Sequence, residues 1–293
     1  MLKSLSNPWE NENIYTDLAC ERYRADTAIQ GVSFKKETTP SGKWERIKIS
    51  SLEGAKSIGR PMGIYSTLHT KRTDLLDEEE ILSAAREIAL ELISLFNESK
   101  ILPKRILVVG LGNPRLTPDS LGPLCAKKIK PTLHIKTMNE EYFSALECSE
   151  IAILTPSVPS ITGIDSAVIT KGVCRQIKPN AVIAIDSLRA EDSERLGTAI
   201  QLSNTGIIAG SGLSAHGSSI DESTAGVPVI SVGIPTVTSA KAFCRGKSAE
   251  NRDYKDERAN KNMLVCLREI GDIIDNSSKI IADGISLAFG LPF

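Results

Sequence analysis

Polar and apolar residues alternate in two short stretches of the N-terminal third of the chain. WERIKIS at 44–50 alternates throughout and GIYSTLH at 63–69 does so in part, as is typical of strands that bury one face. We expect these strands to form a small β-rich lobe near residues 40–70. The following stretch, 77–97, begins with acidic residues and continues with apolar residues at helical spacing. Because acidic side chains in a first turn favour the helix dipole, this stretch predicts a packed amphipathic helix.

From residue 105 the pattern changes to short, nearly continuous runs of apolar residues. Such runs are typical of strands buried on both faces of a parallel or mixed sheet that helices cover. They lie at 105–110, 150–156, 181–186, 198–203 and 227–234. Residues 121–130 and 166–178 supply crossover helices, and isoleucines at helical spacing after residue 269 predict a C-terminal helix. The expected fold is an α/β three-layer sandwich with a mostly parallel central sheet, of the type found in phosphorylases and hydrolases.

Two segments lack these patterns. The first 30 residues or so are polar and mixed in charge, which indicates a flexible arm more than a packed element. Residues 245–262 are almost wholly polar and indicate an exposed loop. We therefore expect an arm over residues 1–17 and a single α/β domain over residues 18–293.

Charge and composition narrow the class of protein. Lys and Arg together number 35 against 36 Asp and Glu, so no cationic field favours direct binding of nucleic acid. The first fifteen residues lack an apolar core of the signal-peptide type, and no apolar run approaches the length of a membrane span. The six cysteines form no CxxC pair, which indicates reduced, structural thiols. A soluble intracellular protein is the expectation.

A glycine-containing loop follows the first of these apolar runs. The sequence VVGLGNPRLTPDSLGP at 108–123 has Gly110 and Gly112 but Arg115 where a dinucleotide fingerprint needs a third glycine. It also lacks the Lys-Ser or Lys-Thr pair of a nucleotide triphosphate loop. The glycines therefore indicate a sharp turn after a strand, and we expect no nucleotide cofactor.

Two aspartates lie where strands are predicted to end. Asp119 follows the strand at 105–110, and Asp186 ends the apolar run AVIAID. In open α/β sheets the functional crevice lies outside the carboxyl ends of the strands, so both side chains can meet there. Each aspartate can instead cap a following helix, which is a common role for this residue type. Asn113 and Thr117 are candidates for orienting water beside the pair, although both are also ordinary turn residues.

Other catalytic patterns are absent from the sequence. There is no GxSxG and no HExxH, and none of His69, His134 and His216 is expected at the end of a core strand. If the protein is a hydrolase, paired carboxyl groups are the remaining simple machinery. Two carboxyl groups held close cannot both ionise cheaply, so one keeps a proton as an acid while the other activates water.

Several stretches in one order resemble the spore germination protease family, endopeptidases that degrade small acid-soluble spore proteins. The matching stretches run from the N-terminal arm nearly to the last helix and are TDLA at 16–19, VVGLGN at 108–113, TPDSLGP at 117–123, ITGIDSAVITKGV at 161–173, KPNAVIAIDSL at 178–188, AIQLSNTGI at 199–207, GSG at 210–212 and GVPVISVGIPTV at 226–237. The resemblance places the family's two candidate catalytic aspartates on Asp119 and Asp186. The chain departs from the family at Asn204, where the family commonly has aspartate, and in its shorter 245–262 segment.

The resemblance implies more than the residues themselves show. It implies a protease that uses no metal or cofactor, differs from pepsin, assembles as a homotetramer, and acts in the cytoplasm of the forespore and spore core. Its partners would be the small acid-soluble spore proteins, with no membrane. Two alternatives stay open, a metal-dependent maturation endopeptidase with a similar core and a catalytically silent peptide-binding paralogue.

The N-terminal arm contains a sequence that is similar to the family's substrate motif. In that motif a threonine and an acidic residue precede the cleaved bond, and an apolar residue and alanine follow it. Thr16-Asp17-Leu18-Ala19 matches this order, so the resemblance implies a zymogen that cleaves itself between Asp17 and Leu18. The alternative is that TDLA starts a short helix with Thr16 or Asp17 as its N-cap.

Overall fold

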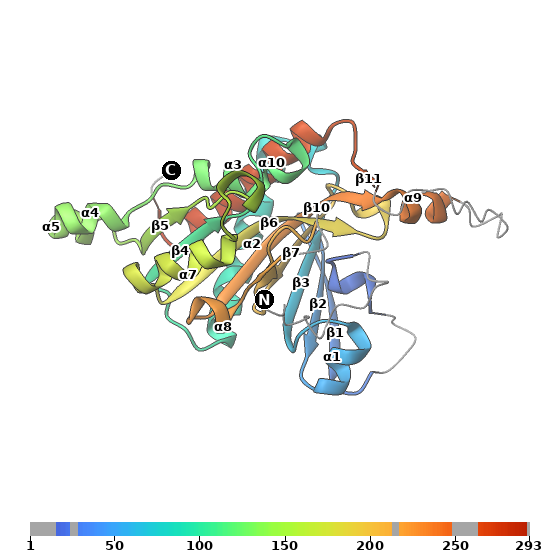
Figure 1. Ribbon diagram of the computed structural model, residues 1–293, viewed down its shortest axis with the longest axis horizontal. Coiled ribbons are helices and arrows are strands. Elements are labelled where there is room, and N and C mark those ends of the chain that lie inside the picture. The colour runs from blue at the N-terminus through green and yellow to red at the C-terminus, as the bar shows by residue number, and fades with distance from the viewer. Residues whose placement is uncertain (1–15, 24–28, 213–216, 248–262, 292–293) are drawn as a thin grey trace.

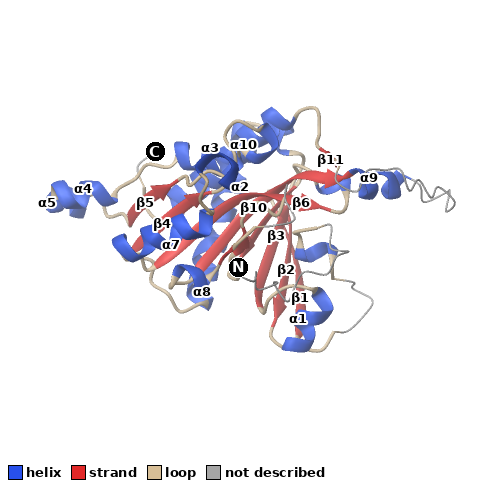
Figure 2. Ribbon diagram, viewed as in Figure 1, coloured by secondary structure: helices blue, strands red, loops and turns tan. Residues whose placement is uncertain are grey.

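The computed structural model describes residues 16–23, 29–212, 217–247 and 263–291, with side chains in 244–247 left undescribed. Its centre is a nine-stranded sheet in the order β1-β2-β3-β7-β10-β6-β4-β5, with β11 paired to β10 (Figures 1 and 2). The strands span β1 Val32–Thr39, β2 Gly42–Ile49, β3 Gly63–His69, β4 Arg105–Gly110, β5 Glu150–Leu154, β6 Ala181–Ala190, β7 Ala199–Ser203, β10 Val229–Ser239 and β11 Leu264–Val265.

The sheet has a parallel half and an antiparallel half. Strands β10, β6, β4 and β5 run parallel to one another, and their near-continuous apolar sequences fit burial on both faces. Strands β1, β2, β3 and β7 pair antiparallel, and β7 joins β10 antiparallel. The β-rich segment predicted near 40–70 therefore extends the central sheet as its antiparallel edge.

Helices cover both faces, which gives the predicted three layers. One face packs against α2 Glu78–Glu98, α3 Leu121–Lys128 and α10 Ile270–Ala288 in the largest apolar cluster. On the other face, α7 Ser166–Ile177 and α8 Glu222–Ala225 pack over the parallel half. A third cluster on that same face includes α1 Leu52–Ile58 and lies over the antiparallel half. The predicted helices at 77–97, 121–130 and 166–178 are thus confirmed within a few residues.

Alternation along β6 shows how the second and third clusters meet. Side chains two residues apart on a strand lie on the same face of the sheet. Val182 and Ala184 belong to the cluster under α7, whereas Leu188 and Ala190 belong to the cluster under α1. Asp186 stands between these two pairs on the same face, so it lies at the boundary of the two clusters.

Several shorter elements were not predicted from the sequence. They include α1, strand β1, which pairs with β2 through a hairpin, and α9 Ala240–Lys247, which takes up the first residues of the predicted 245–262 loop. The rest of that predicted loop, 248–262, lies outside the described residues. The others include α4 Leu133–Met138, α5 Glu140–Ala145, α6 Pro159–Thr162, β8 Ile207–Ile208 and β9 Ser219–Ile220. A search of the described residues found no helix with the length and apolarity to cross a membrane.

The prediction of a flexible N-terminal arm is wrong for residues 16–23. Thr16, Leu18 and Ala19 are almost wholly buried, and Leu18 is 0% exposed. Leu18 and Ala19 pack in the cluster over the antiparallel half, with Ile47 and Leu188 among their neighbours. The physical reason is the short apolar run that starts at Leu18, which can be buried even though the surrounding sequence is polar. The earlier part of the predicted arm, 1–15, lies outside the described residues.

Candidate active site

Asp186 is a buried carboxyl group in the body of strand β6. The strand continues four residues beyond it to Ala190, so the expectation that Asp186 ends its strand is wrong. Its side chain is 0% exposed and accepts hydrogen bonds from the backbone amides of Ser187 and Gly210, both at 2.8 Å. Burial raises the pKa of Asp186 to about 8 against the lowering effect of these amides.

Asp119 ends the short 3₁₀ turn Thr117–Asp119 after strand β4. Gly112, at φ +109°, brings the preceding loop against this turn, where a Cβ atom would lie 2.0 Å from the carbonyl oxygen of Asp119. Oδ2 of Asp119 accepts a hydrogen bond from the Asn113 backbone amide at 2.8 Å. Burial, which leaves Asp119 only 5% exposed, raises the pKa of this carboxyl to about 6.

The two carboxyl groups interact electrostatically. Their strands, β4 and β6, are parallel neighbours, and the negative charge of Asp119 adds to burial in raising the pKa of Asp186. Neither side chain caps a helix: α3 has Ser120 at its N-cap with no side-chain bond, and Asp186 lies within a strand. The capping alternative is therefore wrong for both aspartates, and burial raises the pKa of Asp186 further than that of Asp119.

The two candidate supporting residues contribute mainly through the backbone. Asn113 donates its amide to Asp119, while its side-chain oxygen accepts from the Arg115 amide at 2.9 Å and closes a turn. Thr117 accepts at its carbonyl oxygen from the Ser120 hydroxyl at 2.9 Å. The segment 210–212 covers Asp186, because Gly210 donates to it and the Gly212 carbonyl accepts from Arg189 Nε at 3.0 Å.

Residues 16–19 lie against the β6 strand that carries Asp186. The Asp17 amide donates to the Arg189 carbonyl at 2.7 Å, and the Arg189 amide donates to Asp17 Oδ2 at 2.8 Å. Arg60 donates to the Thr16 carbonyl and has a guanidinium nitrogen 3.9 Å from Asp17 Oδ1. The charge of Asp17 also raises the pKa of Asp186. The chain thus holds one of its own peptide segments close to Asp186.

Neither Thr16 nor Asp17 acts as a helix cap. The 3₁₀ turn that follows begins at Ala19, has Leu18 at its N-cap and shows no side-chain cap bond. Thr16 instead accepts from the Leu18 amide at 3.0 Å. The alternative that TDLA serves as a helix start with one of these two residues as its cap is wrong.

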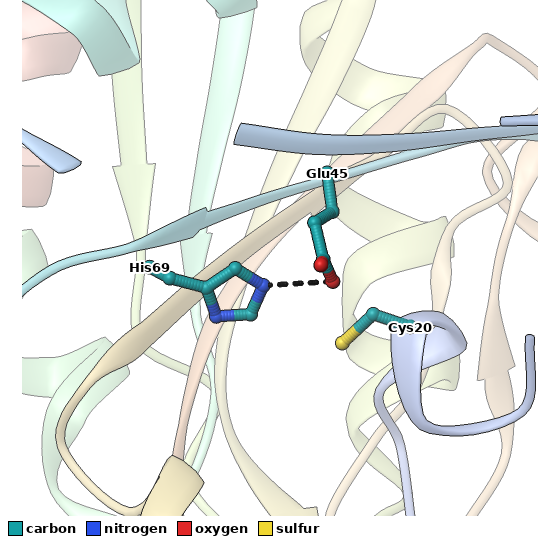
Figure 3. A group of neighbouring side chains, drawn as sticks. All are labelled: Cys20, Glu45 and His69. Atoms are coloured by element: carbon teal, nitrogen blue, oxygen red, sulfur yellow. Dashed lines mark hydrogen bonds and ion pairs between the residues drawn. The ribbon is translucent and has the colours of Figure 1, made fainter. Parts of the chain in front are cut away.

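One cluster with metal-ligating side chains was found among the described residues. Cys20, Glu45 and His69 offer ligand atoms within 4.8 Å of one another, and Figure 3 shows Glu45 and His69 bonded with the Cys20 sulfur beside them. His69 is the last residue of β3, so the expectation that no histidine ends a core strand is wrong. Two positively charged side chains already contact this cluster. A guanidinium nitrogen of Arg195 lies 2.7 Å from His69 Nδ1, and Lys36 Nζ lies 3.0 Å from Glu45 Oε1.

The pKa values of Glu45 and Cys20 fit an ion-pair network at this cluster better than a metal site. The hydrogen bond from His69 is the main cause that lowers the pKa of Glu45 to about 2. Burial raises the pKa of the Cys20 thiol to about 11, so the thiolate that a metal requires is disfavoured. The cluster joins the turn after residue 18 to strands β2 and β3.

The fold and site define a class: an α/β protein with two buried, interacting carboxyl groups, one in the turn after strand β4 and one within its parallel neighbour β6, and a peptide segment docked against β6. The model of the germination protease family matches residues 9–247. A germination protease of Caldanaerobacter subterraneus subsp. tengcongensis is 37% identical over 94% of this chain and 94% of its own. That of Bacillus subtilis is 35% identical over 86% of this chain and 72% of its own. The chain belongs to the germination protease family and is therefore a protease.

A search of solved structures gives a more distant likeness. The NiFe hydrogenase maturation protease HycI from Thermococcus kodakarensis KOD1 matches with a TM-score of 0.35 and 15% identity, over 67% of this chain and 99% of that one.

Proposed function

We propose that this chain is an aspartic-type endopeptidase, unlike pepsin, that cleaves small acid-soluble spore proteins during germination. The observation that carries the proposal is the interacting pair Asp119 and Asp186, since the two acids differ in their tendency to ionise. The relatives' names, germination protease, support the setting. The proposal includes action in the cytoplasm of the forespore and spore core, without a metal, and assembly as a homotetramer.

In the proposed reaction Asp119 acts as the base and Asp186 as the acid. The Asp119 carboxylate takes a proton from water as the water oxygen bonds to the peptide carbonyl carbon. Asp186 donates its proton to the carbonyl oxygen, so no free oxyanion forms. The carbon–nitrogen bond then breaks as Asp119 gives its proton to the leaving nitrogen, and the hydroxyl group of the intermediate returns a proton to Asp186. Both acids regain their starting states.

We also propose that the chain is a zymogen that cleaves itself between Asp17 and Leu18. The docking of residues 16–19 against the strand of Asp186 supports this, because hydrogen bonds fix the backbone on both sides of that bond. A positioned peptide reacts faster than a free one, since its entropy has been lost on docking.

Paired substitutions test this function. Asp119→Asn and Asp186→Asn conserve shape and remove the titrating group, so each should lower self-cleavage and cleavage of a spore-protein peptide by about 10²- to 10⁴-fold. Asp272→Asn is the matched control, because Asp272 is exposed in the first turn of α10. Intact-mass analysis follows the appearance of a chain that begins at Leu18.

Four results would count against the proposal. Near-normal turnover in either Asp119→Asn or Asp186→Asn would remove the acid pair from the mechanism. Trimming at a different bond, or equal trimming in the Asp186→Asn protein, would remove the self-cleavage claim. Wild-type protein that binds a spore-protein peptide and never cleaves it would favour the silent peptide-binding paralogue.

A further inference from the structure

Gln201 is a polar residue inside the apolar strand β7, and its side chain bonds to the docked N-terminal segment. Its Nε2 donates to the Asp17 carbonyl oxygen at 3.0 Å, and its Oε1 accepts from the Ala19 amide at 2.8 Å. The peptide bond between Asp17 and Leu18 lies between these two contacts. One side-chain amide therefore holds the backbone on both sides of the bond that we propose is cleaved.

The sheet register places Gln201 in line with Asp186. Gly233 of β10 pairs with Asp186 of β6 on one side and with Gln201 of β7 on the other. Residues paired across neighbouring strands direct their side chains to the same face. Gly233 itself contributes no side chain between Asp186 and Gln201, and the Leu188 side chain lies over it instead.

Close packing explains why this middle position is glycine. A Cβ atom on Gly233 would lie 2.6 Å from the Asp186 carbonyl oxygen and 2.7 Å from Leu188 Cγ. Such contacts are too short for any side chain without movement of strand β6. The strand pairing therefore leaves Asp186 and Gln201 on one row of the sheet, with the docked peptide held above that row by Gln201.

The burial of Gln201 makes these two hydrogen bonds significant. The residue is 7% exposed, and a buried amide without partners is costly. Both of its polar atoms are used by the docked segment. Donors that are already aimed at a carbonyl oxygen stabilise the negative charge that develops there when water attacks.

We propose that Gln201 is a catalytic residue of this protease, whose amide nitrogen polarises the carbonyl of the bond that is cleaved. Its side-chain oxygen binds the amide of the second residue after that bond and so fixes the peptide's register. This inference rests on the proposed function, because it takes Asp17–Leu18 as the cleaved bond. It adds a hydrogen-bond donor to the acid pair and assigns β7 to the active site.

Gln201→Glu separates the two contacts of the side chain. The variant keeps an oxygen that can accept from the Ala19 amide and replaces the donor with an oxygen. Loss of one such donor should lower the kcat of self-cleavage and of peptide cleavage by about 10²- to 10³-fold, with a much smaller change in KM. Gln201→Met, which has a similar size and carries no charge, should show a comparable loss of kcat.

Asn204→Asp is the matched control, since it also converts an amide to an acid just beyond the end of β7. The side-chain oxygen of Asn204 accepts from the Ile64 amide at 2.8 Å, and its nitrogen contacts the Ser99 hydroxyl at 3.4 Å. Those contacts are with β3 and the end of α2, away from the docked segment, so kcat should stay within about twofold of wild type, as expected for a site without contact to the substrate.

Hydrogen exchange in an Asp186→Asn background tests docking without cleavage. The Ala19 amide should stay protected with Gln201 or Gln201→Glu, and it should exchange at least tenfold faster with Gln201→Met. If wild type cleaves Asp17–Leu18 and both Gln201 variants keep its kcat, the inference about Gln201 is overturned while the proposed function stands. If wild type never cleaves that bond, the proposed self-cleavage fails, and the catalytic role of Gln201 fails with it.

Discussion

Asp186 should make the folded protein lose stability as the pH rises, and Asp186→Asn should abolish that loss. The carboxyl group is 0% exposed and has its pKa raised from 3.8 to about 8. In the unfolded chain the same group ionises near its ordinary value. Between the two pKa values the folded state holds a proton that the unfolded state has released, so stability falls with rising pH in this window.

The expected size follows from the width of that window. One pKa unit corresponds to about 1.4 kcal/mol, so the full difference of about four units gives roughly 6 kcal/mol at high pH. Between pH 5 and pH 7 the free energy of unfolding of wild type should fall by about 2 to 3 kcal/mol through this group alone. Below about pH 3 the group is protonated in both states and contributes no slope.

Asp186→Asn changes the free energy of unfolding at every pH as well as its dependence on pH. The two oxygens of Asp186 each accept from one backbone amide, those of Ser187 and Gly210, whereas asparagine has one accepting oxygen and a nitrogen that cannot accept. The lost bond costs about 1 to 3 kcal/mol at every pH. The test is therefore the pH dependence of the difference between the two proteins and does not depend on its absolute value.

Urea unfolding at pH 5, 6 and 7, at one protein concentration, measures this difference. Intact mass must show that both samples are uncleaved, and Asp272→Asn, at an exposed position, supplies a protein that should keep the wild-type slope. The free energy of unfolding of Asp186→Asn should rise relative to that of wild type by about 1 kcal/mol or more for each pH unit. Parallel curves for wild type and Asp186→Asn would show that Asp186 does not hold a proton in the folded state.

Three further outcomes are expected. The kcat of peptide cleavage should rise as Asp119 ionises near pH 6 and fall as Asp186 loses its proton near pH 8; a monotonic profile contradicts the assigned roles. EDTA or phenanthroline should leave activity unchanged, since the metal-ligating cluster found among the described residues, Cys20, Glu45 and His69, includes neither Asp119 nor Asp186. Loss of activity that added metal restores would favour the maturation-protease alternative. Gly233→Ala should cost about 1 to 3 kcal/mol in thermal unfolding, whereas Gly271→Ala, with open space around it, should cost none.

The parallel half of the fold was predictable because its signals are local. The apolar runs in β4, β5, β6 and β10 reflect burial on both faces, and each run can be recognised from the sequence of that strand alone. The capping box that begins α2, from Asp77 to Glu80, is also local. The pairing of β3 with β7 is different, because its partners, such as Thr67 and Gln201, are far apart in the chain. No short window of sequence contains that information.

The candidate site was predicted in part. Asp119 and Asp186 were proposed from the rule that ligands bind beyond the carboxyl ends of parallel strands, although Asp186 lies four residues before the end of β6. Gln201 was missed, although a polar residue within the apolar run TAIQLS was a usable signal, since buried polar groups need partners. Arg60 gave no such signal, because an exposed arginine and one that binds Thr16 look alike in sequence.

The junction between the two halves of the sheet explains why Asp186 lies on a face of the sheet, whereas Asp119 lies in the turn beyond its edge. The parallel half of that face is covered by α7 and α8 as far as Ala184. Beyond Asp186, at Leu188 and Ala190, the cover includes the segment that contains Leu18 and Ala19. A helix packed there would keep Asp186 covered, whereas under the proposed self-cleavage one hydrolysis would let this short extended segment rearrange. The antiparallel strand β7 brings Gln201 into the same row as Asp186. In an all-parallel sheet with helices on both faces, that row would be covered by a helix. The mixed sheet therefore provides both the acid pair and the surface on which a peptide can be held against it.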